Sequence, residues 1–242
     1  MAASQTSNSA SKVKENLLAV IDQAGLAAQR GHRPPPRVVA VSKTKPIEDI
    51  KAAYDAGHRD FGENYVQEIV EKSGRLPKEI RWRFIGHLQS NKVKTLLEGV
   101  PSLECIETLD TMKLANKLNT AVEAMGRQPL TCMVQVNTSG EESKHGVDPS
   151  EVIGLCTHIA NNCPNLRLGG LMTIGMPDYT SRPENFATLV SCRDAVAEAL
   201  GMQKEALELS MGMSGDFCSA IEMGSTSVRV GSTIFGARNS NK

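Results

Sequence analysis

The sequence of 242 residues has few aromatic side chains and no excess of charge of either sign. Phe, Trp and Tyr together make up 4% of the chain, which argues against an aromatic platform for stacking nucleobases. Lys and Arg total 27, as do Asp and Glu, so the formal net charge is zero. No summed electrostatic field favours nucleic acid or an anionic membrane. We therefore expect neither as a partner.

Long hydrophobic runs are also missing. No apolar stretch approaches the roughly 18 residues that a membrane-spanning helix needs. The first 15 residues are rich in Ser but contain no Arg and no apolar core, so they do not resemble a secretory signal or a mitochondrial presequence. We expect residues 1–9 to form a loose tail ahead of a single domain over residues 10–242. We further expect a cytoplasmic monomer, with an organellar pool not excluded by the Ser-rich tail.

Cysteine pairs with the spacing of metal ligands do not occur. The six cysteines are scattered, and no CxxC pair is present. In a chain of this length the simplest interpretation is reduced thiols that act as small core residues. The polar segment 137–146 contains Glu141, Glu142 and His145, but their spacing does not suggest metal ligation. We predict no metal site.

What the sequence does contain is a regular alternation of strand and helix patterns. An amphipathic stretch from Ser11 to Arg30 comes first and stops at a run of three prolines. Eight short, mostly apolar strands are then predicted at Val38–Ser42, Asp60–Gly62, Arg81–Ile85, Ser102–Ile106, Thr131–Val136, Arg167–Leu171, Glu208–Ser210 and Ser227–Val230. Helices are predicted between them at Ile47–Ala56, Val66–Leu76, Asp110–Met125, Pro149–Asn162, Arg182–Leu200 and Phe217–Met223.

This pattern predicts an α/β protein with a single (β/α)8 TIM barrel and an extra N-terminal helix. Eight parallel strands with outer helices, in a chain close to about 250 residues, are typical of that fold. The main competitor is a doubly wound open sheet, which usually carries a Gly-rich phosphate turn after its first strand. Here the first strand leads into SKTKP, and the Gly-rich segments lie near the C-terminus. The barrel is therefore favoured.

Lys43 follows the first strand, at the barrel end where catalytic side chains gather. A partly desolvated lysine there favours the neutral amine that imine chemistry requires. Lys45, two positions on, faces the same side if the strand persists. The alternative is that Lys43 is a solvated loop residue, as lysines after strands usually are, and this stretch taken alone favours that alternative.

Two loops near the C-terminus favour phosphate binding. Residues 210–216 (SMGMSGD) follow the seventh strand, and residues 229–232 (RVGS) follow the eighth. TIM barrels frequently bind phosphate with these two loops. Glycine lets the backbone approach an anion closely, and serine adds a hydroxyl donor. Tight turns alone remain the competing explanation for the glycines.

Three further segments have a structural and a functional interpretation. Asn64 with Gln67 matches a helix-capping box, which explains that segment without chemistry. His87, at the expected mouth, is favoured as a satisfied hydrogen-bonding residue over a general base. The segment 137–146 is either a lid or a solvated loop.

Together these motifs resemble the pyridoxal phosphate homeostasis protein family. The resemblance rests on AVSKTKP at 40–46, FGENYVQE at 61–68, FIGHLQSNK at 84–92, GLMTIG at 170–175, LSMGMSGD at 209–216 and VRVGSTIFG at 228–236. It implies a barrel like the N-terminal domain of alanine racemase that binds pyridoxal 5'-phosphate (PLP) as a Schiff base on Lys43. It also implies a homeostatic role in storing, protecting or delivering PLP, with apo PLP-dependent enzymes as possible recipients.

The resemblance also implies which residues contact the cofactor. Alanine racemases pair a phosphate-binding Ser with an Arg fifteen residues later and a Gly two beyond it. Ser214, Arg229 and Gly231 keep that spacing. Phosphate contacts are thus implied for Ser214, Gly231 and Ser232, and a contact with the pyridine nitrogen for Arg229. The remaining implied cofactor-binding residues are Asn64, Met172 and Ser210.

Three functions remain open at this stage. The first is a non-catalytic PLP-binding protein, which is favoured because an Arg on the pyridine nitrogen weakens the ring as an electron sink. The second is a PLP-dependent amino-acid racemase. We expect the chain, which ends soon after the eighth strand, to lack the second domain that racemases use. The third is a Schiff-base aldolase acting on a phosphorylated sugar.

Overall fold

The computed structural model describes residues 2–140, 145–175 and 183–237, and side chains from residue 9 onward. Eight strands form its centre: β1 (Arg37–Val41), β2 (Asp60–Glu63), β3 (Arg81–Phe84), β4 (Leu103–Leu109), β5 (Leu130–Gln135), β6 (Leu166–Met172), β7 (Glu208–Met213) and β8 (Ser227–Val230). They pair in parallel in sequence order, and β8 pairs with β1 to close a barrel. The predicted (β/α)8 barrel is confirmed.

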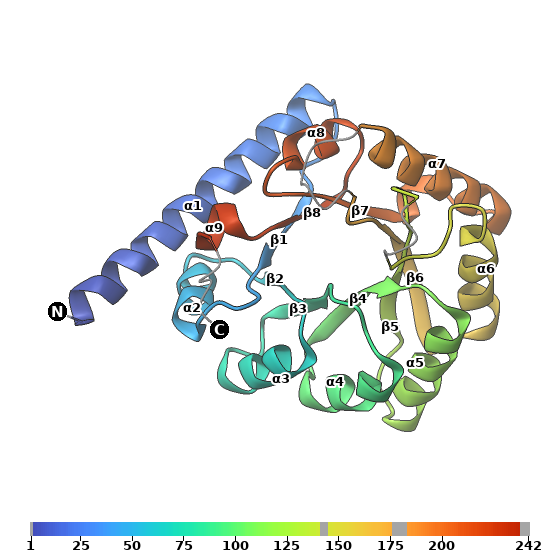
Figure 1. The fold of residues 1–242 in the computed structure, drawn as a ribbon, viewed down its shortest axis with the longest axis horizontal. Coiled ribbons are helices and arrows are strands. Elements are labelled where there is room, and N and C mark those ends of the chain that lie inside the picture. The colour runs from blue at the N-terminus through green and yellow to red at the C-terminus, as the bar shows by residue number, and fades with distance from the viewer. Residues whose placement is uncertain (1, 141–144, 176–182, 238–242) are drawn as a thin grey trace.

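Helices surround the strands (Figure 1). The α-helices are α1 (Ala2–Arg30), α2 (Ile47–Asp55), α3 (Val66–Arg75), α4 (Val93–Gly99), α5 (Met112–Ala124), α6 (Val152–Asn162), α7 (Pro183–Leu200), α8 (Phe217–Glu222) and α9 (Ser232–Phe235). Two 3-10 turns, η1 (Ser90–Lys92) and η2 (Lys204–Ala206), precede α4 and β7. No helix among the described residues is both long enough and apolar enough to cross a membrane.

The N-terminal helix α1 is longer than the sequence suggested. It begins at Ala2, so the loose tail expected over residues 1–9 is wrong from Ala2 onward. No Gly or Pro interrupts residues 2–24, and helix can therefore propagate through the Ser-rich segment. The apolar stripe of α1 includes Leu17 and Val20, both fully buried. It packs on α2, α8 and α9 along the outside of the barrel (Figure 1).

The main hydrophobic core lies between the strands and the helices, and it includes the fully buried Trp82, Phe61 and Phe84. Five of the six cysteines are buried, and all six are free thiols. A second, small apolar cluster of Cys105, Met133 and Met172 is separate from that core. Buried polar residues accompany it, and they belong to the site described next.

Candidate functional site

Lys43 lies in a turn two residues beyond β1. The strand ends at Val41, and Thr44 takes a left-handed backbone conformation with φ 62°. The main-chain N–H of Lys45 then donates to Ser42 O at 3.0 Å, closing the turn. The side chain of Lys43 is partly buried. The strand does not persist to position 45, so Lys45 does not share a strand face with Lys43 as expected.

Lys45 instead points to the C-terminal segment, where its Nζ donates to Ala237 O at 2.7 Å. Desolvation lowers the pKa of Lys45, against the opposing charge of Asp49. The two lysines of the SKTKP motif therefore have different surroundings. Their difference makes them a matched pair for mutagenesis.

A buried ion cluster holds the turn that carries Lys43. Lys72, from α3, donates to the main-chain oxygen of Ser42 at 2.9 Å and to the Glu63 carboxylate at 2.7 Å. The Ser42 hydroxyl donates to the same Glu63 oxygen at 2.7 Å. Glu63 is fully buried, and Lys72 is 6% exposed. Because a buried charge is tolerated only when it is paired, the cluster fixes the position of Ser42 and of the residue after it.

Glu68 extends this cluster to the other side of the turn. It accepts from Lys72 Nζ and from the main-chain N–H of Thr44, both at 2.8 Å. Burial raises the pKa of Glu63, although Lys72 opposes the shift. The turn around Lys43 is thus held from its Ser42 and Thr44 sides by side chains of β2 and α3.

The loops after β7 and β8 meet each other through main-chain donors. Ser214 Oγ lies near the main-chain N–H groups of Gly231 and Thr233, which donate to it at 3.2 and 3.4 Å. Ser232 lies between those two residues and is exposed. The structure therefore brings Ser214 to Gly231 and to Thr233, the residues on either side of Ser232. An anion site at this place stays a prediction.

This donor-rich corner also adjoins the turn of Lys43. A Cβ built on Gly231 would lie 3.2 Å from Val41 O, at the end of β1. The β1 and β8 strands pair directly, with Val39 opposite Arg229. Lys43 and the β7–β8 corner consequently share one stretch of the barrel rim, around the carboxyl ends of β1 and β8.

Arg229 points into the barrel interior and is nearly fully buried, at 4% exposure. Its Nη1 donates to Ser210 Oγ at 2.6 Å and its Nη2 donates to Thr173 O at 2.7 Å. Ser210 in turn donates to Glu107, which also accepts from Arg83 Nε. A continuous chain of hydrogen bonds therefore connects Arg83 of β3 with Arg229 of β8.

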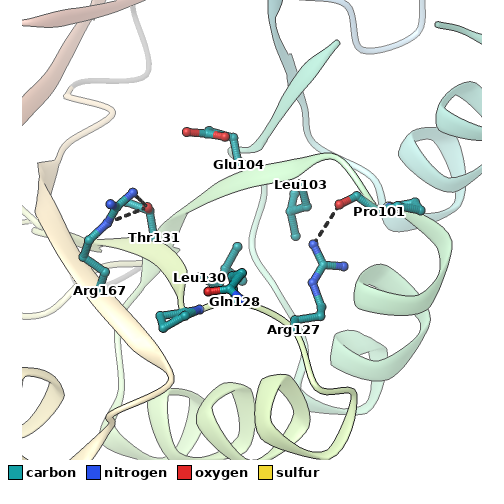
Figure 2. Close-up of a pocket in the computed structure, with 9 residues that line it drawn as sticks. Pro101, Leu103, Glu104, Arg127, Gln128, Leu130, Thr131 and Arg167 are labelled. Atoms are coloured by element: carbon teal, nitrogen blue, oxygen red, sulfur yellow. Dashed lines mark hydrogen bonds between the residues drawn. The ribbon is translucent and has the colours of Figure 1, made fainter. Parts of the chain in front are cut away.

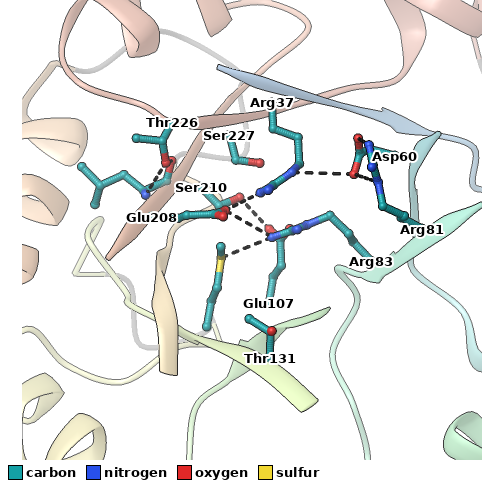
Figure 3. A network of polar contacts seen from close by, with 12 residues as sticks. Arg37, Asp60, Arg81, Arg83, Glu107, Thr131, Glu208, Ser210, Thr226 and Ser227 are labelled. Atoms are coloured by element: carbon teal, nitrogen blue, oxygen red, sulfur yellow. Dashed lines mark hydrogen bonds and ion pairs between the residues drawn. The ribbon is translucent and has the colours of Figure 1, made fainter. Parts of the chain in front are cut away.

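Figure 3 shows the middle of this chain together with the neighbouring charges of the barrel. Glu208 accepts from Arg37 and lies 3.5 Å from Arg83. Arg37 also lies 3.6 Å from Asp60, which pairs with Arg81. A network of alternating guanidinium and carboxylate groups thus runs from the buried Arg83 and Glu107 to the more exposed Arg37 and Arg81.

The charges of this network control the protonation of its members. Burial raises the pKa of Glu107, but Arg83, Arg229 and the Ser210 hydroxyl outweigh burial and bring it below the ordinary 4.5. Burial lowers the pKa of Arg229, with Glu107 and Asp216 opposing it. Glu107 is therefore ionised at neutral pH, and its charge balances guanidinium groups on either side.

Asn64 and Met172 have different environments. Asn64 Oδ1 is buried, and it has no hydrogen-bond partner among the described residues. A polar atom in that state is ready to accept from a ligand. Met172 is fully buried at the end of β6, opposite Ser210 of β7. Of the eight predicted site residues, the structure thus joins Ser210 with Arg229 and Ser214 with Gly231.

Two structural interpretations of the sequence are corrected. The N-cap of α3 is Tyr65, and no side chain caps that helix, so the capping box of Asn64 and Gln67 does not form. His87 has no hydrogen-bond partner in the part of the chain that the structure describes, so it is not the satisfied hydrogen-bonding residue that was expected. Its Nδ1 lies 3.9 Å from Asp110, longer than a hydrogen bond, and its ring stacks on His145. The suggested lid over 137–146 includes residues 141–144, which lie outside the described residues.

A cavity of about 420 Å³ lies at the opposite end of the barrel, where β4, β5 and β6 begin. Figure 2 shows its two arginines engaged with the protein itself. Arg127 donates to the main-chain oxygens of Leu97 and Pro101, and Arg167 donates to Thr131. Because these contacts hold the chain together at the amino ends of the strands, we interpret the cavity as structural.

Comparison with known proteins agrees with this geometry. The family model of the alanine racemase N-terminal domain matches residues 17–239. The chain is therefore a protein of the alanine racemase N-terminal domain class. The pyridoxal phosphate homeostasis protein of Mus musculus is 52% identical over 217 residues, covering 86% of this chain and 78% of the relative. The chain therefore belongs to the pyridoxal phosphate homeostasis protein family.

Solved structures show the same relationship. PipY of Synechococcus elongatus PCC7942 with PLP bound has a TM-score of 0.72 at 31% identity, covering 93% of this chain and all of PipY. Alanine racemase from Corynebacterium glutamicum has a TM-score of 0.71 at 14% identity, covering 94% of this chain and 62% of the racemase. The racemase comparison supports the fold alone.

Proposed function

We propose that this protein binds PLP, holds it as a Schiff base on Lys43, and serves intracellular PLP homeostasis by storing, protecting or delivering the cofactor without significant catalysis. One observation carries the proposal. The turn of Lys43 and the main-chain donors around Ser214 and Gly231 lie next to each other on the barrel rim. A lysine and an anion site at one barrel mouth match the two ends of PLP. The family's name and the PLP-bound PipY relative support the choice of ligand.

The phosphate end of the cofactor fits the corner between the β7 and β8 loops. The main-chain N–H groups of Gly231 and Thr233 already converge on one oxygen, Ser214 Oγ. Ser214 and the exposed Ser232 add hydroxyl groups that can donate to a phosphate. These contacts need no charged side chain, and they keep hold of the phosphate when the covalent link to Lys43 is open.

The ring end of the cofactor fits Arg229. A guanidinium group only donates hydrogen bonds, so an acceptor such as an unprotonated pyridine nitrogen suits it. Ser210 and Thr173 O hold two of its nitrogen atoms in place. Asn64 offers its Oδ1, which has no hydrogen-bond partner among the described residues, and Met172 is a fully buried apolar side chain at the end of β6. We assign all four predicted residues, Arg229, Ser210, Asn64 and Met172, to the surroundings of the ring.

PLP would supply an aldehyde group, and the Lys43 amine would hold the cofactor through it as a Schiff base, with loss of one water molecule. The chain contributes the position of that amine. Lys72 and Glu68 hold the main chain on both sides of Lys43, so the amine is presented from a fixed turn rather than from a free loop. An ordered attachment point of this kind lowers the entropic cost of forming the link.

The same arrangement disfavours catalysis. Arg229 cannot give a proton to the ring nitrogen as a carboxylic acid can, so the ring is a weak electron sink. The relatives are named as homeostasis proteins rather than as enzymes. We place the protein in the cytoplasm as a monomer, with PLP as its ligand and apo PLP-dependent enzymes as possible recipients. A PLP-dependent amino-acid racemase is the alternative.

Absorbance tests the binding site. PLP-loaded protein is expected to show the visible band of a Schiff base, and borohydride or Lys43→Ala is expected to abolish it. Lys45→Ala is the matched control and keeps the band, because the Lys45 amine bonds to Ala237 O. A Lys43→Ala variant with an unchanged band would refute the assignment.

Two assays separate a carrier from a racemase. Loaded protein is incubated with single L-amino acids in deuterated water, and optical rotation and α-carbon deuteration are followed. Turnover of about 1 per second or more, a rate ordinary for enzymes, would contradict the carrier. The carrier hypothesis predicts instead that loaded protein activates a PLP-dependent apo-enzyme without such turnover.

A further inference from the structure

Three side chains with metal-binding atoms meet on the barrel rim, and none of them has a part in the proposed cofactor site. His87 follows β3, Asp110 follows β4, and His145 comes from the segment after β5. These are three successive strands of the barrel (Figure 1). One ligand atom from each residue lies within 4.8 Å of the other two.

The two imidazole rings face each other closely. Their centroids are 3.7 Å apart and their planes differ by 10°. This is a stacked arrangement, which brings the nitrogen atoms of two imidazole rings to one place on the rim. His87 Nδ1 also lies 3.9 Å from Asp110 Oδ2. That separation is too long for a hydrogen bond, but an ion can bridge it.

The site is open to solvent on one side and shielded on the other. The His87 side chain is 41% exposed and that of Asp110 is 12% exposed, while His145 is exposed. An ion can therefore enter from solvent without a change of fold. The carboxylate it meets is mostly shielded, which strengthens its attraction for a cation.

The ligand set selects the kind of ion. Two nitrogen atoms and one carboxylate oxygen suit Zn²⁺ and neighbouring divalent transition metals, whereas Mg²⁺ and Ca²⁺ prefer oxygen ligands. Ligand atoms of a tetrahedral zinc site lie about 3.4 Å apart. The ligand atoms, which lie within 4.8 Å of one another, therefore need to approach by up to about 1.4 Å. Rotation of the exposed His87 and His145 side chains provides that movement.

We propose that His87, Asp110 and His145 form a binding site for a divalent transition metal such as Zn²⁺, with solvent at the fourth position. A bound ion would tie the segment after β5 to the segments after β3 and β4. Sequence spacing hides this set, because its members stand at positions 87, 110 and 145 and become neighbours only through the closed order of the strands.

Cobalt provides a direct test, because Co²⁺ in a tetrahedral nitrogen–oxygen site has much stronger visible absorption than the hydrated ion. Untagged, PLP-free full-length protein is titrated with Co²⁺, and Zn²⁺ is then added to displace it. We expect saturation at one ion per chain and loss of the visible bands on addition of Zn²⁺. Absence of any saturable spectrum would overturn the proposal.

Variants identify the ligands. His87→Gln, Asp110→Asn and His145→Gln are each expected to weaken Co²⁺ affinity at least about tenfold. His32→Asn is the matched control, since His32 lies before β1 at the other end of the barrel and asparagine tolerates its positive φ of 51°. Its affinity is expected to stay unchanged. Circular dichroism confirms that each variant folds. Equal affinity in all folded variants, or an equal loss in His32→Asn, would overturn the assignment.

Discussion

Replacing Glu107 by Gln tests how the barrel interior holds Arg229. The substitution keeps the shape of the side chain and removes one charge. Glu107 is fully buried between Arg83 and Ser210, and Ser210 connects it to Arg229. Removing its charge leaves two buried guanidinium groups with less counter-charge. The glutamine amide would also point an N–H group at either Arg83 or the Ser210 hydroxyl. Both of these groups donate hydrogen bonds to Glu107, so two donors would then face each other.

The magnitude follows from the burial of the pair. Removing one partner of a buried ion pair costs about 3–5 kcal/mol. The lower end applies here, because Glu208 lies 3.5 Å from Arg83 and supplies part of the lost charge. About 3 kcal/mol corresponds to a fall in Tm of about 6–12 °C for a domain of this size. Urea unfolding and differential scanning calorimetry both measure the effect.

Two controls make the result specific. Asp55→Asn breaks an exposed ion pair with Lys51, and its free energy of unfolding is expected to change by at most about 0.5 kcal/mol. In the double variant Arg83→Met with Glu107→Gln, the cost is expected to be less than the sum of the single costs, because the two groups interact directly. A loss below about 1 kcal/mol in Glu107→Gln would refute the reasoning.

Three further predictions concern pH, packing and thiols. The pKa of Glu107 lies below 4.5 in the folded protein, so below pH 4.5 the unfolded chain binds more protons than the folded chain, and the free energy of unfolding falls. The difference in this free energy between the native protein and Glu107→Gln should therefore become smaller at low pH. A difference that does not change with pH would contradict this prediction. Gly86→Ala would place a Cβ 1.9 Å from Asn64 O and should lower the free energy of unfolding in urea by about 1–3 kcal/mol. Gly74 has open space around it, so Gly74→Ala should not destabilise the protein. Equal effects of the two substitutions would be inconsistent with the packing. With a thiol reagent at pH 8, the partly exposed Cys218 should react in a fast phase, before Cys105, because burial raises the pKa of Cys105 to about 12. The Cys218→Ser variant should lack this fast phase. A fast phase that persists in the variant would contradict the predicted order of reaction.

Much of the fold could be predicted from the sequence, because each strand and each longer helix has its own local pattern. The strand expected at Ser227–Val230 has those same bounds in the structure. Helix α4 was missed because it has only seven residues, Val93–Gly99, fewer than the two turns that show a helical period clearly. The start of α1 was missed because Ser-rich composition was interpreted as a tail although nothing breaks the helix there.

The site was predictable only in part. Lys43, Ser214 and Gly231 follow strands directly, so their approximate place follows from the barrel itself. Glu107 could not be predicted in the same way, because its partners Arg83 and Ser210 are 24 and 103 residues away in sequence. No local pattern marks an inward-facing charge whose partners come from other strands.

The central claim is that the Lys43 amine carries the cofactor, and peptide mapping tests it most directly. PLP-loaded protein is reduced with borohydride, digested and sequenced by mass spectrometry. The account predicts a pyridoxyl phosphate group on Lys43 and none on Lys45. A label on Lys45 or on another lysine, with Lys43 unmodified, would contradict it.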